Sequence, residues 1–131
     1  MNTVIENKIY KTQTFQDLIV WQKAHKLTLA IYKITKQFPK EEVYGLISQM
    51  RRSAVSVPAN IAEGYKKRGK LDKARFFNIS EGSLNEIKYY LILSKDLNYL
   101  NSEFSELDNL SEEISKLLSA YIRAIYDDHK K

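Results

Sequence analysis

The chain of 131 residues contains no cysteine, so it can form no disulfide, no thiolate metal site and carries no cysteine nucleophile. Its four glycines and two prolines leave few positions for the tight turns of a β-rich protein. The longest apolar runs, residues 18–21 and 89–93, are much shorter than the roughly 20 residues that span a bilayer. We therefore expect an all-α, single-domain, cytoplasmic protein that does not associate with membranes.

Motifs for catalysis, phosphate cradling and metal binding are missing as well. The two histidines, His25 and His129, have no second histidine or carboxylate at the spacing of helical metal ligands. No GxxxxGK[ST], GxGxxG or GxSxG pattern occurs. Glu63 and Glu81 are interpreted as solvated surface carboxylates and not as a catalytic pair. The sequence thus predicts a protein that is not an enzyme and that holds no cofactor and no metal.

Apolar residues recur every three or four positions through most of the chain, which is typical of amphipathic helices. This spacing predicts helices at about 16–37, 42–63, 71–97 and 104–125. Thr14 and Asp17 mark the first start, and Gly64 is placed as a left-handed cap on the second helix. Long helices with short connections pack as an antiparallel up-down-up-down four-helix bundle. We assign residues 14–127 to the bundle, 1–13 to a flexible N-terminal lead and 128–131 to a polar tail.

Two runs place apolar side chains all around a helix. LIVW at 18–21 and YYLIL at 89–93 exceed the single stripe that each helix of a monomeric bundle buries. The surplus predicts a homo-oligomer, and the alternative is a scatter of exposed apolar residues as found on many monomers. The predicted interface consists of Leu18, Ile19, Val20, Trp21, Tyr89 and Tyr90.

The segment SVPANIAEG at 56–64 contains a proline within the second predicted helix. Pro58 lacks an N–H and clashes with the carbonyl of Ala54, so we expect a kink with unpaired backbone acceptors. Polar side chains nearby can satisfy them; the alternative is a polar binding pocket. The predicted structural signature consists of Ser53, Ser56, Pro58, Asn60, Glu63 and Gly64.

Positive charge is unevenly distributed. Residues 1–40 carry seven basic and two acidic side chains, residues 41–80 eight and four, and residues 81–131 six and ten. A cluster of Lys and Arg attracts phosphate backbones with little sequence preference. The predicted nucleic-acid contacts are Arg51, Arg52, Lys66, Lys67, Arg68, Lys70, Lys73 and Arg75. Tyr65 is a candidate for base stacking, whereas Phe76 and Phe77 are assigned to the core.

The segments DLIVWQKA, FPKEEVYGLISQMRRSAVSVPANIAEG and EGSLNE closely resemble the four-helix-bundle proteins encoded within intervening sequences of 23S rRNA genes. Relatives of that family include the accessory variability protein of diversity-generating retroelements, a basic, barrel-shaped homopentamer that binds nucleic acid and the reverse transcriptase. The resemblance implies a ring-like homo-oligomer, with a pentamer favoured, and a nucleic-acid role with RNA slightly preferred over DNA. It leaves open a scaffold that docks a protein partner such as a reverse transcriptase, and a selfish-element protein without selected host function.

Overall fold

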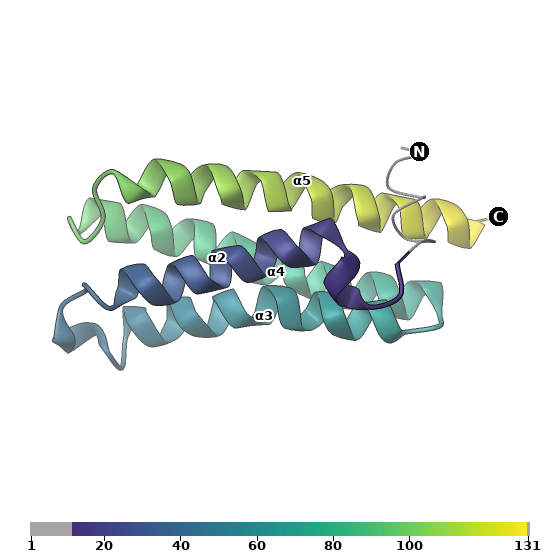
Figure 1. The fold of residues 1–131 in the computed structure, drawn as a ribbon, viewed down its shortest axis with the longest axis horizontal. Coiled ribbons are helices and arrows are strands. Elements are labelled where there is room, and N and C mark those ends of the chain that lie inside the picture. Colours follow the sequence, from purple (N-terminus) through teal and green to yellow (C-terminus); the bar gives the residue numbers. More distant parts are fainter. Residues whose placement is uncertain (1–11, 131) are drawn as a thin grey trace.

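The protein is described here by a computed structural model that covers residues 12–130 and is built from long helices with two short 3-10 turns (Figure 1). The four long helices in this range are α2 (Ile19–Thr35), α3 (Leu46–Lys66), α4 (Lys70–Asp96) and α5 (Glu103–Lys130). The 3-10 turns η1 (Phe15–Asp17) and η2 (Lys40–Glu42) precede α2 and α3. No strand occurs between residues 12 and 130, so the predicted all-α class is confirmed.

Contacts between neighbouring helices show that each runs opposite to the next. Ser53 of α3 lies beside Glu86 of α4, and further along α3 Ser56 meets Ser83, so numbering rises on one helix as it falls on the other. The same reversed order holds for the pairs Thr28 with Ala54, Thr35 with Arg51, Lys70 with Asp128 and Lys88 with Glu112. The helices therefore form the predicted up-down-up-down bundle, with loops at alternate ends (Figure 1).

The interior of the bundle is filled by the apolar positions that recur every three or four residues. Side chains from all four helices are almost completely removed from water: Leu27, Ile31, Met50, Val57, Ile61, Leu84, Ile87, Leu91, Ile114 and Leu118. Each such side chain contributes about 1.5–3 kcal/mol when fully buried. Periodic apolar residues thus account for one continuous core, and the loops carry little of it.

The first helix begins later than predicted. The carboxylate of Asp17 accepts hydrogen bonds from the backbone N–H groups of Gln13 and Thr14 at 3.0 and 3.1 Å, and these bonds lower the pKa of Asp17. The predicted start at Thr14 and Asp17 therefore exists, but it opens only the turn η1. Leu18 then adopts an extended conformation, with φ −73° and ψ 128°, so α2 begins at Ile19.

The prediction of a left-handed cap at Gly64 is wrong. Helix α3 continues through Gly64 to Lys66, and none of the glycines in residues 12–130 has a positive φ. A Cβ at Gly64 would lie 3.1 Å from Cβ of Phe76 and 3.2 Å from the ring of Phe77. The glycine is present because α4 passes close to α3 at this point.

A left-handed cap occurs instead at the end of α4. Asn98 has φ 64°, the conformation that asparagine tolerates best after glycine. The N–H of Tyr99 donates to the carbonyl of Ser94 at 2.8 Å, and the N–H of Asn98 donates to that of Lys95 at 3.0 Å. These two bonds form a Schellman motif, which ends α4 at the start of the gap between the helices predicted at 71–97 and 104–125.

The C-terminal helix is longer than predicted. Helix α5 continues to Lys130, through most of the segment 128–131 that we assigned to a polar tail. An ion pair between Lys70 and Asp128 joins this last turn to the start of α4, and His129 and Lys130 favour the negative end of the helix dipole. Residues 1–11, most of the predicted N-terminal lead, lie outside the described residues.

Candidate nucleic-acid interface

Pro58 is buried inside α3, and the helix continues through it. The proline ring cannot supply the N–H that the carbonyl of Ala54 would otherwise accept. The hydroxyl of Thr28 on α2 lies 2.9 Å from that carbonyl and 3.0 Å from the carbonyl of Ala24, so its single proton serves these two acceptors. A polar side chain does repair the break, as predicted, but it comes from the neighbouring helix.

The signature residues around Pro58 form a polar seam between α3 and α4. Ser53 donates to Oε2 of Glu86 at 3.2 Å. The hydroxyls of Ser56 and Ser83 lie 2.7 Å apart, and Nδ2 of Asn60 donates to the carbonyl of Ser56 at 2.8 Å. Each such bond contributes about 0.5–1.5 kcal/mol net. These side chains satisfy one another, which supports their predicted structural role over that of a binding pocket.

Glu63, which we included in the structural signature, does not take part in this seam, and its position agrees with our interpretation of a solvated surface carboxylate. Its side chain is exposed and lies 3.8 Å from Nζ of Lys67, one helical turn later. It therefore belongs to the charged turn between α3 and α4. Gly64, the other signature residue near the end of α3, serves the close approach of α4 described above.

The turn between α3 and α4 presents two basic side chains without a carboxylate partner. Lys66, the last residue of α3, and Arg68 in the connection are both exposed. Neither forms an ion pair with any residue between 12 and 130. Their charges are available to a polyanion.

Other basic side chains of this turn are paired. Lys70 contacts Asp128 of α5, and Nη2 of Arg75 lies 3.0 Å from Oδ1 of Asp72. The Arg75 guanidinium and Nζ of Lys67 also lie over the ring of Phe76, at 4.6 and 5.0 Å from its centroid. Phe76, which we assigned to the core, is only half-buried and supports these two cations.

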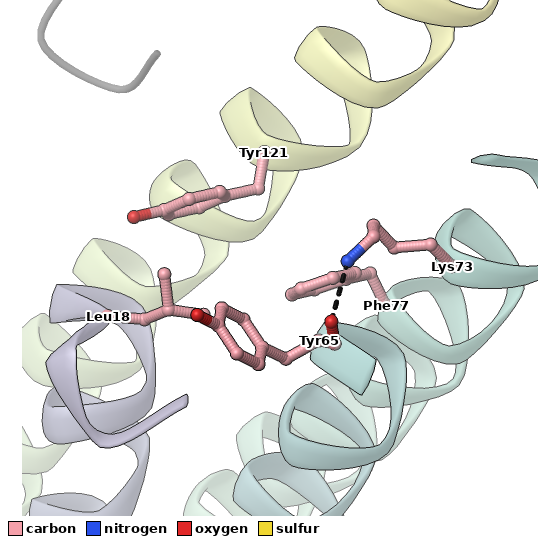
Figure 2. Close-up of a pocket in the computed structure, with 5 residues that line it drawn as sticks. All are labelled: Leu18, Tyr65, Lys73, Phe77 and Tyr121. Carbon is pink, nitrogen blue, oxygen red and sulfur yellow. Dashed lines mark hydrogen bonds between the residues drawn. The ribbon is translucent and has the colours of Figure 1, made fainter. Parts of the chain in front are cut away.

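Lys73 is directed inward, and Figure 2 shows its contact with the end of α3. Its Nζ donates at 2.8 Å to the carbonyl of Tyr65, which lies in the last turn of α3, where backbone acceptors lack helical partners. Burial, and then the charge of Lys70, lower the pKa of Lys73. Its predicted contact with phosphate is not supported by this position, because the amine closes a helix end.

The cavity in Figure 2 lies beside this contact. It has a volume of about 290 Å³ and is lined by Leu18, Tyr65, Lys73, Phe77 and Tyr121. The rings of Phe77 and Tyr121 are parallel, with centroids 6.2 Å apart, and burial raises the pKa of Tyr121. Phe77 is a core residue, as predicted. Tyr65 is half-buried in the wall of the cavity, so it is not an open stacking platform.

Arg51 and Arg52 do not join the turn between α3 and α4. Lys66 follows Arg51 by fifteen positions on the same helix, which separates them by about 22 Å at 1.5 Å per residue. The single basic surface that we predicted from residues 51–75 is therefore divided between the two ends of α3. We grouped these side chains because they are close in the sequence, but the length of α3 separates them in space.

Around Arg51 and Arg52 the structure forms a groove that the sequence did not indicate. Its volume is about 530 Å³. The groove is lined by Tyr32, Thr35, Lys36, Phe38, Lys40, Val43, Tyr44, Ile47, Ser48, Arg51 and Arg52, and we call it the α2–α3 groove. Lys36, Lys40 and Tyr44 could have been noticed as basic and aromatic residues near Arg51, but their separation in the sequence weakened that signal.

The predicted oligomer interface is only partly exposed. Leu18 and Val20 are 1% and 0% exposed within a single chain, so they offer no surface to a neighbour. Trp21 is half-buried between Phe15, in an edge contact, and His25, in a stacked one. Leu18 is buried because it precedes α2, which begins at Ile19, and points into the core from an extended segment.

The remaining interface candidates lie at the edge of the core or on the surface. Ile19 is half-buried, and so is Tyr90, whose hydroxyl donates to Oε2 of Glu86 at 3.4 Å. Tyr89 is 57% exposed. Of the predicted set, Tyr89 therefore offers the largest exposed side chain to a partner.

Between residues 12 and 130, no three His, Asp or Glu side chains gather closely enough to hold a metal ion. In the same range no helix combines the length and apolar character that crossing a membrane requires.

Comparisons with known proteins identify relatives of this fold. The family model for the 23S rRNA-intervening sequence protein matches residues 16–120, which include both ends of α3. A protein of unknown function from the S23 ribosomal protein family of Bacteroides thetaiotaomicron VPI-5482 is similar in structure, with a TM-score of 0.73 and 27% sequence identity. The similarity covers 80% of this chain and 96% of that chain. No curated protein matches the sequence.

Proposed function

The chain belongs to the 23S rRNA-intervening sequence protein family, and we propose that it is a non-enzymatic, homo-oligomeric accessory protein that binds nucleic-acid backbones. The observation that carries the proposal is the excess of positive charge at the turn between α3 and α4. Only three acidic side chains, those of Glu63, Asp72 and Asp128, pair with basic side chains there. The basic side chains number six: Lys66, Lys67, Arg68, Lys70, Lys73 and Arg75. The preference for RNA over DNA follows from the family resemblance.

The ion pairs at this turn do not prevent phosphate binding. Both partners in the pairs of Lys70 with Asp128 and Arg75 with Asp72 keep a substantial exposed fraction, and exposed pairs contribute only about 0–1 kcal/mol. A phosphate backbone offers many charges and releases condensed counterions when cations approach it. Lys66 and Arg68 form the first contacts in this proposal, and paired cations exchange a carboxylate for a phosphate.

The outer face of α4 supports the homo-oligomeric part of the proposal. Gly82, Tyr89 and Ile92 are all exposed, and their spacing of seven and three places them on one side of the helix. A Cβ at Gly82 would meet nothing within 4 Å, so the glycine leaves room for a neighbour. Tyr89 and Ile92 give this face exposed apolar surface beside the exposed Asn85 and Glu86, and at Gly82 a neighbouring helix can approach the backbone. A pentamer is the state that the family resemblance favours.

The binding proposal is tested by replacing Lys66, Lys67, Arg68 and Lys70 with Gln and titrating structured RNA and duplex DNA across a salt series. We expect the wild type to bind both at low salt, with affinity that falls as salt rises. For duplex DNA, each lost phosphate contact should reduce the slope of log K against log salt by about 0.9. Fluorescence anisotropy of labelled nucleic acid measures both quantities.

A matched control replaces four basic residues elsewhere, namely Lys26, Lys95, Lys116 and Arg123, with Gln. This variant loses the same net charge and should keep most of the affinity, because its substitutions lie outside the α3–α4 turn. Equal losses in both variants would show that only net charge matters. Affinity of the first variant equal to wild type would contradict the proposed surface.

The oligomer is tested by light scattering during gel filtration. We expect a mass several times 15.3 kDa, and Tyr89→Glu together with Ile92→Glu should reduce it, because buried carboxylates would oppose association. A monomeric wild type at micromolar concentration would overturn the oligomeric part and leave the binding test unaffected.

A further inference from the structure

The α2–α3 groove combines an aromatic edge with a basic wall. Tyr44 is 97% exposed, so almost none of its ring packs against the chain that carries it. Tyr44 lines the groove together with Lys40, which precedes it in the sequence, and Ile47, which follows it. Exposed aromatic rings beside Lys and Arg are typical of surfaces that stack unpaired bases.

No carboxylate lines this groove. Lys36, Lys40 and Arg52 are exposed and form no ion pair within the described part of the chain. The nearby Glu42 is held elsewhere, since its Oε2 accepts the hydroxyl of Tyr99 at 2.9 Å. This bond is also the main reason why the pKa of Tyr99 is raised. The groove therefore attracts an anion more directly than the turn between α3 and α4 does.

Arg51 is already fixed in place at the groove wall. Its Nε donates to Oγ1 of Thr35 at 3.0 Å, and its Nη2 donates to the carbonyl of Tyr32 at 3.3 Å. Its guanidinium lies 4.7 Å from the centroid of the Tyr32 ring. Because a guanidinium has five N–H donors, some remain for a ligand, and little side-chain freedom would be lost when one binds.

The size and floor of the groove fit a nucleotide. Its volume of about 530 Å³ lies within the range of small-molecule sites. Phe38 and Ile47 line it and are both buried, which gives the groove an apolar floor. A base in a duplex is stacked on its neighbours and cannot reach such a surface, whereas an unpaired base can.

We propose that the α2–α3 groove binds a single-stranded nucleic-acid segment, with Arg51, Arg52 and Lys36 on phosphates and an unpaired base stacked on Tyr44. The site goes beyond the proposed function, which places backbone contacts at the opposite end of α3. The two sites give the protein different selectivity. The turn responds to charge alone, and the groove distinguishes unpaired from paired nucleotides.

The test uses the full chain and two labelled ligands, a single-stranded RNA of ten nucleotides and an RNA duplex of equal length. We expect Tyr44→Ala to weaken single-strand binding about tenfold, which lies within the range of about 5- to 150-fold for the loss of one base stacked on an aromatic ring. Duplex binding should change less than twofold. Tyr44→Phe should retain single-strand affinity because the ring remains. Arg52→Gln should reduce the salt slope for the single strand by about 0.7.

A direct readout is photocrosslinking of single-stranded RNA that contains 5-iodouridine, followed by peptide mass spectrometry. The expected crosslink is at Tyr44. Tyr126→Ala is the control, because this partly exposed tyrosine on α5 does not line the groove. A loss of affinity in Tyr126→Ala equal to that in Tyr44→Ala would overturn the inference.

The outcomes separate this site from the proposed function. If the four-residue turn variant loses binding while Tyr44→Ala does not, the inference fails and the proposed function stands. If Tyr44→Ala loses single-strand binding while the turn variant keeps its affinity, the groove is the site and the proposed surface fails. If Tyr44→Ala instead lowers the mass in light scattering, a second copy of the chain covers the groove and the inference is overturned.

Discussion

The two ends of α3 both carry basic side chains, and they differ in how those side chains are held. Near its start, Arg51 is fixed by Thr35 and Tyr32, in a groove without carboxylates. Beside its end, Lys70 and Arg75 at the start of α4 are paired with acidic residues. The denser basic run in the sequence is thus the more neutralised one in the structure. The availability of a charge depends on partners such as Asp128, which come from distant parts of the chain.

The largest effect is expected from a substitution near the end of α3, away from the groove at the start of that helix. Gly64→Val would place a branched side chain where even a Cβ lies 3.1 Å from Phe76 and 3.3 Å from the carbonyl of Lys73. We expect a loss of about 3 kcal/mol in the free energy of unfolding, the upper range for overpacking. Urea denaturation followed by circular dichroism measures it.

Gly82→Ala is the control for this substitution. Within a single chain Gly82 is exposed, and a Cβ there meets nothing within 4 Å. In protein that carries Tyr89→Glu and Ile92→Glu, which remove the proposed subunit contact, alanine at this position should raise the free energy of unfolding by about 0.5–1 kcal/mol. Opposite signs for the two glycines would confirm that α3 and α4 approach closely at Gly64. A loss below about 0.5 kcal/mol for Gly64→Val, within the range of ordinary surface changes, would contradict it.

The next largest effect is expected in the middle of α3, where the hydroxyl of Thr28 donates to the carbonyl of Ala54. Thr28→Val removes the hydroxyl that satisfies the carbonyl of Ala54 and should cost about 2 kcal/mol, as for a buried acceptor left unpaired. In a Pro58→Ala background the new N–H can bond to that carbonyl, so the same substitution should cost clearly less. The double-mutant cycle from urea unfolding gives the difference. Equal costs in both backgrounds would show that Thr28 does not serve the acceptor exposed by the proline.

A smaller effect compares Arg51, near the start of α3, with Arg75, on α4 beside the end of α3. Arg51→Met keeps the alkyl stem and removes two hydrogen bonds to α2, so we expect a loss of about 1 kcal/mol. Arg75→Met breaks an exposed pair with Asp72 and should cost less than about 0.5 kcal/mol. Urea midpoints of the two variants are compared at equal ionic strength. A larger cost for Arg75→Met would reverse our description of the two ends.

The smallest effect concerns Lys73, which lies in the first turn of α4, beside the end of α3. Burial, and then repulsion from Lys70, lower its pKa, since both disfavour the charged amine. Competitive labelling with acetic anhydride across pH should therefore give the Lys73 peptide a midpoint below the ordinary lysine value of about 10.4. Because the folded pKa is lowered, folding becomes relatively more favourable as pH rises from the folded to the unfolded value.

The control for this measurement is the same peptide in unfolded protein. In concentrated urea its labelling midpoint should return to the ordinary value, because burial is lost. An identical midpoint in native protein and in urea would mean that the Lys73 amine is fully solvated, and it would contradict the contact with Tyr65.

Apolar spacing was enough to predict the helices, because each helix buries one stripe whatever its neighbours are. It was not enough for LIVW, since Leu18 lies outside α2 and enters the core from an extended residue. The repair of Pro58 by Thr28 and the role of Gly64 depend on which helices are adjacent, and local pattern does not contain this information. The same limit applies to the α2–α3 groove, whose lining residues come from two helices and their connection.

The proline in α3 also bears on how the chain chooses among bundle topologies. Ala54 presents its carbonyl to a hydroxyl of α2, and three positions later Val57 presents its carbonyl to the hydroxyl of Ser80 on α4 at 2.8 Å. Four helices of this pattern can wind around their axis in either hand, and reversing the hand exchanges the sides on which α2 and α4 flank α3. In the reversed arrangement the carbonyl of Ala54 would face away from Thr28, with no N–H from Pro58 to replace it. A residue that removes one backbone N–H from α3 thereby favours one handedness of the whole bundle.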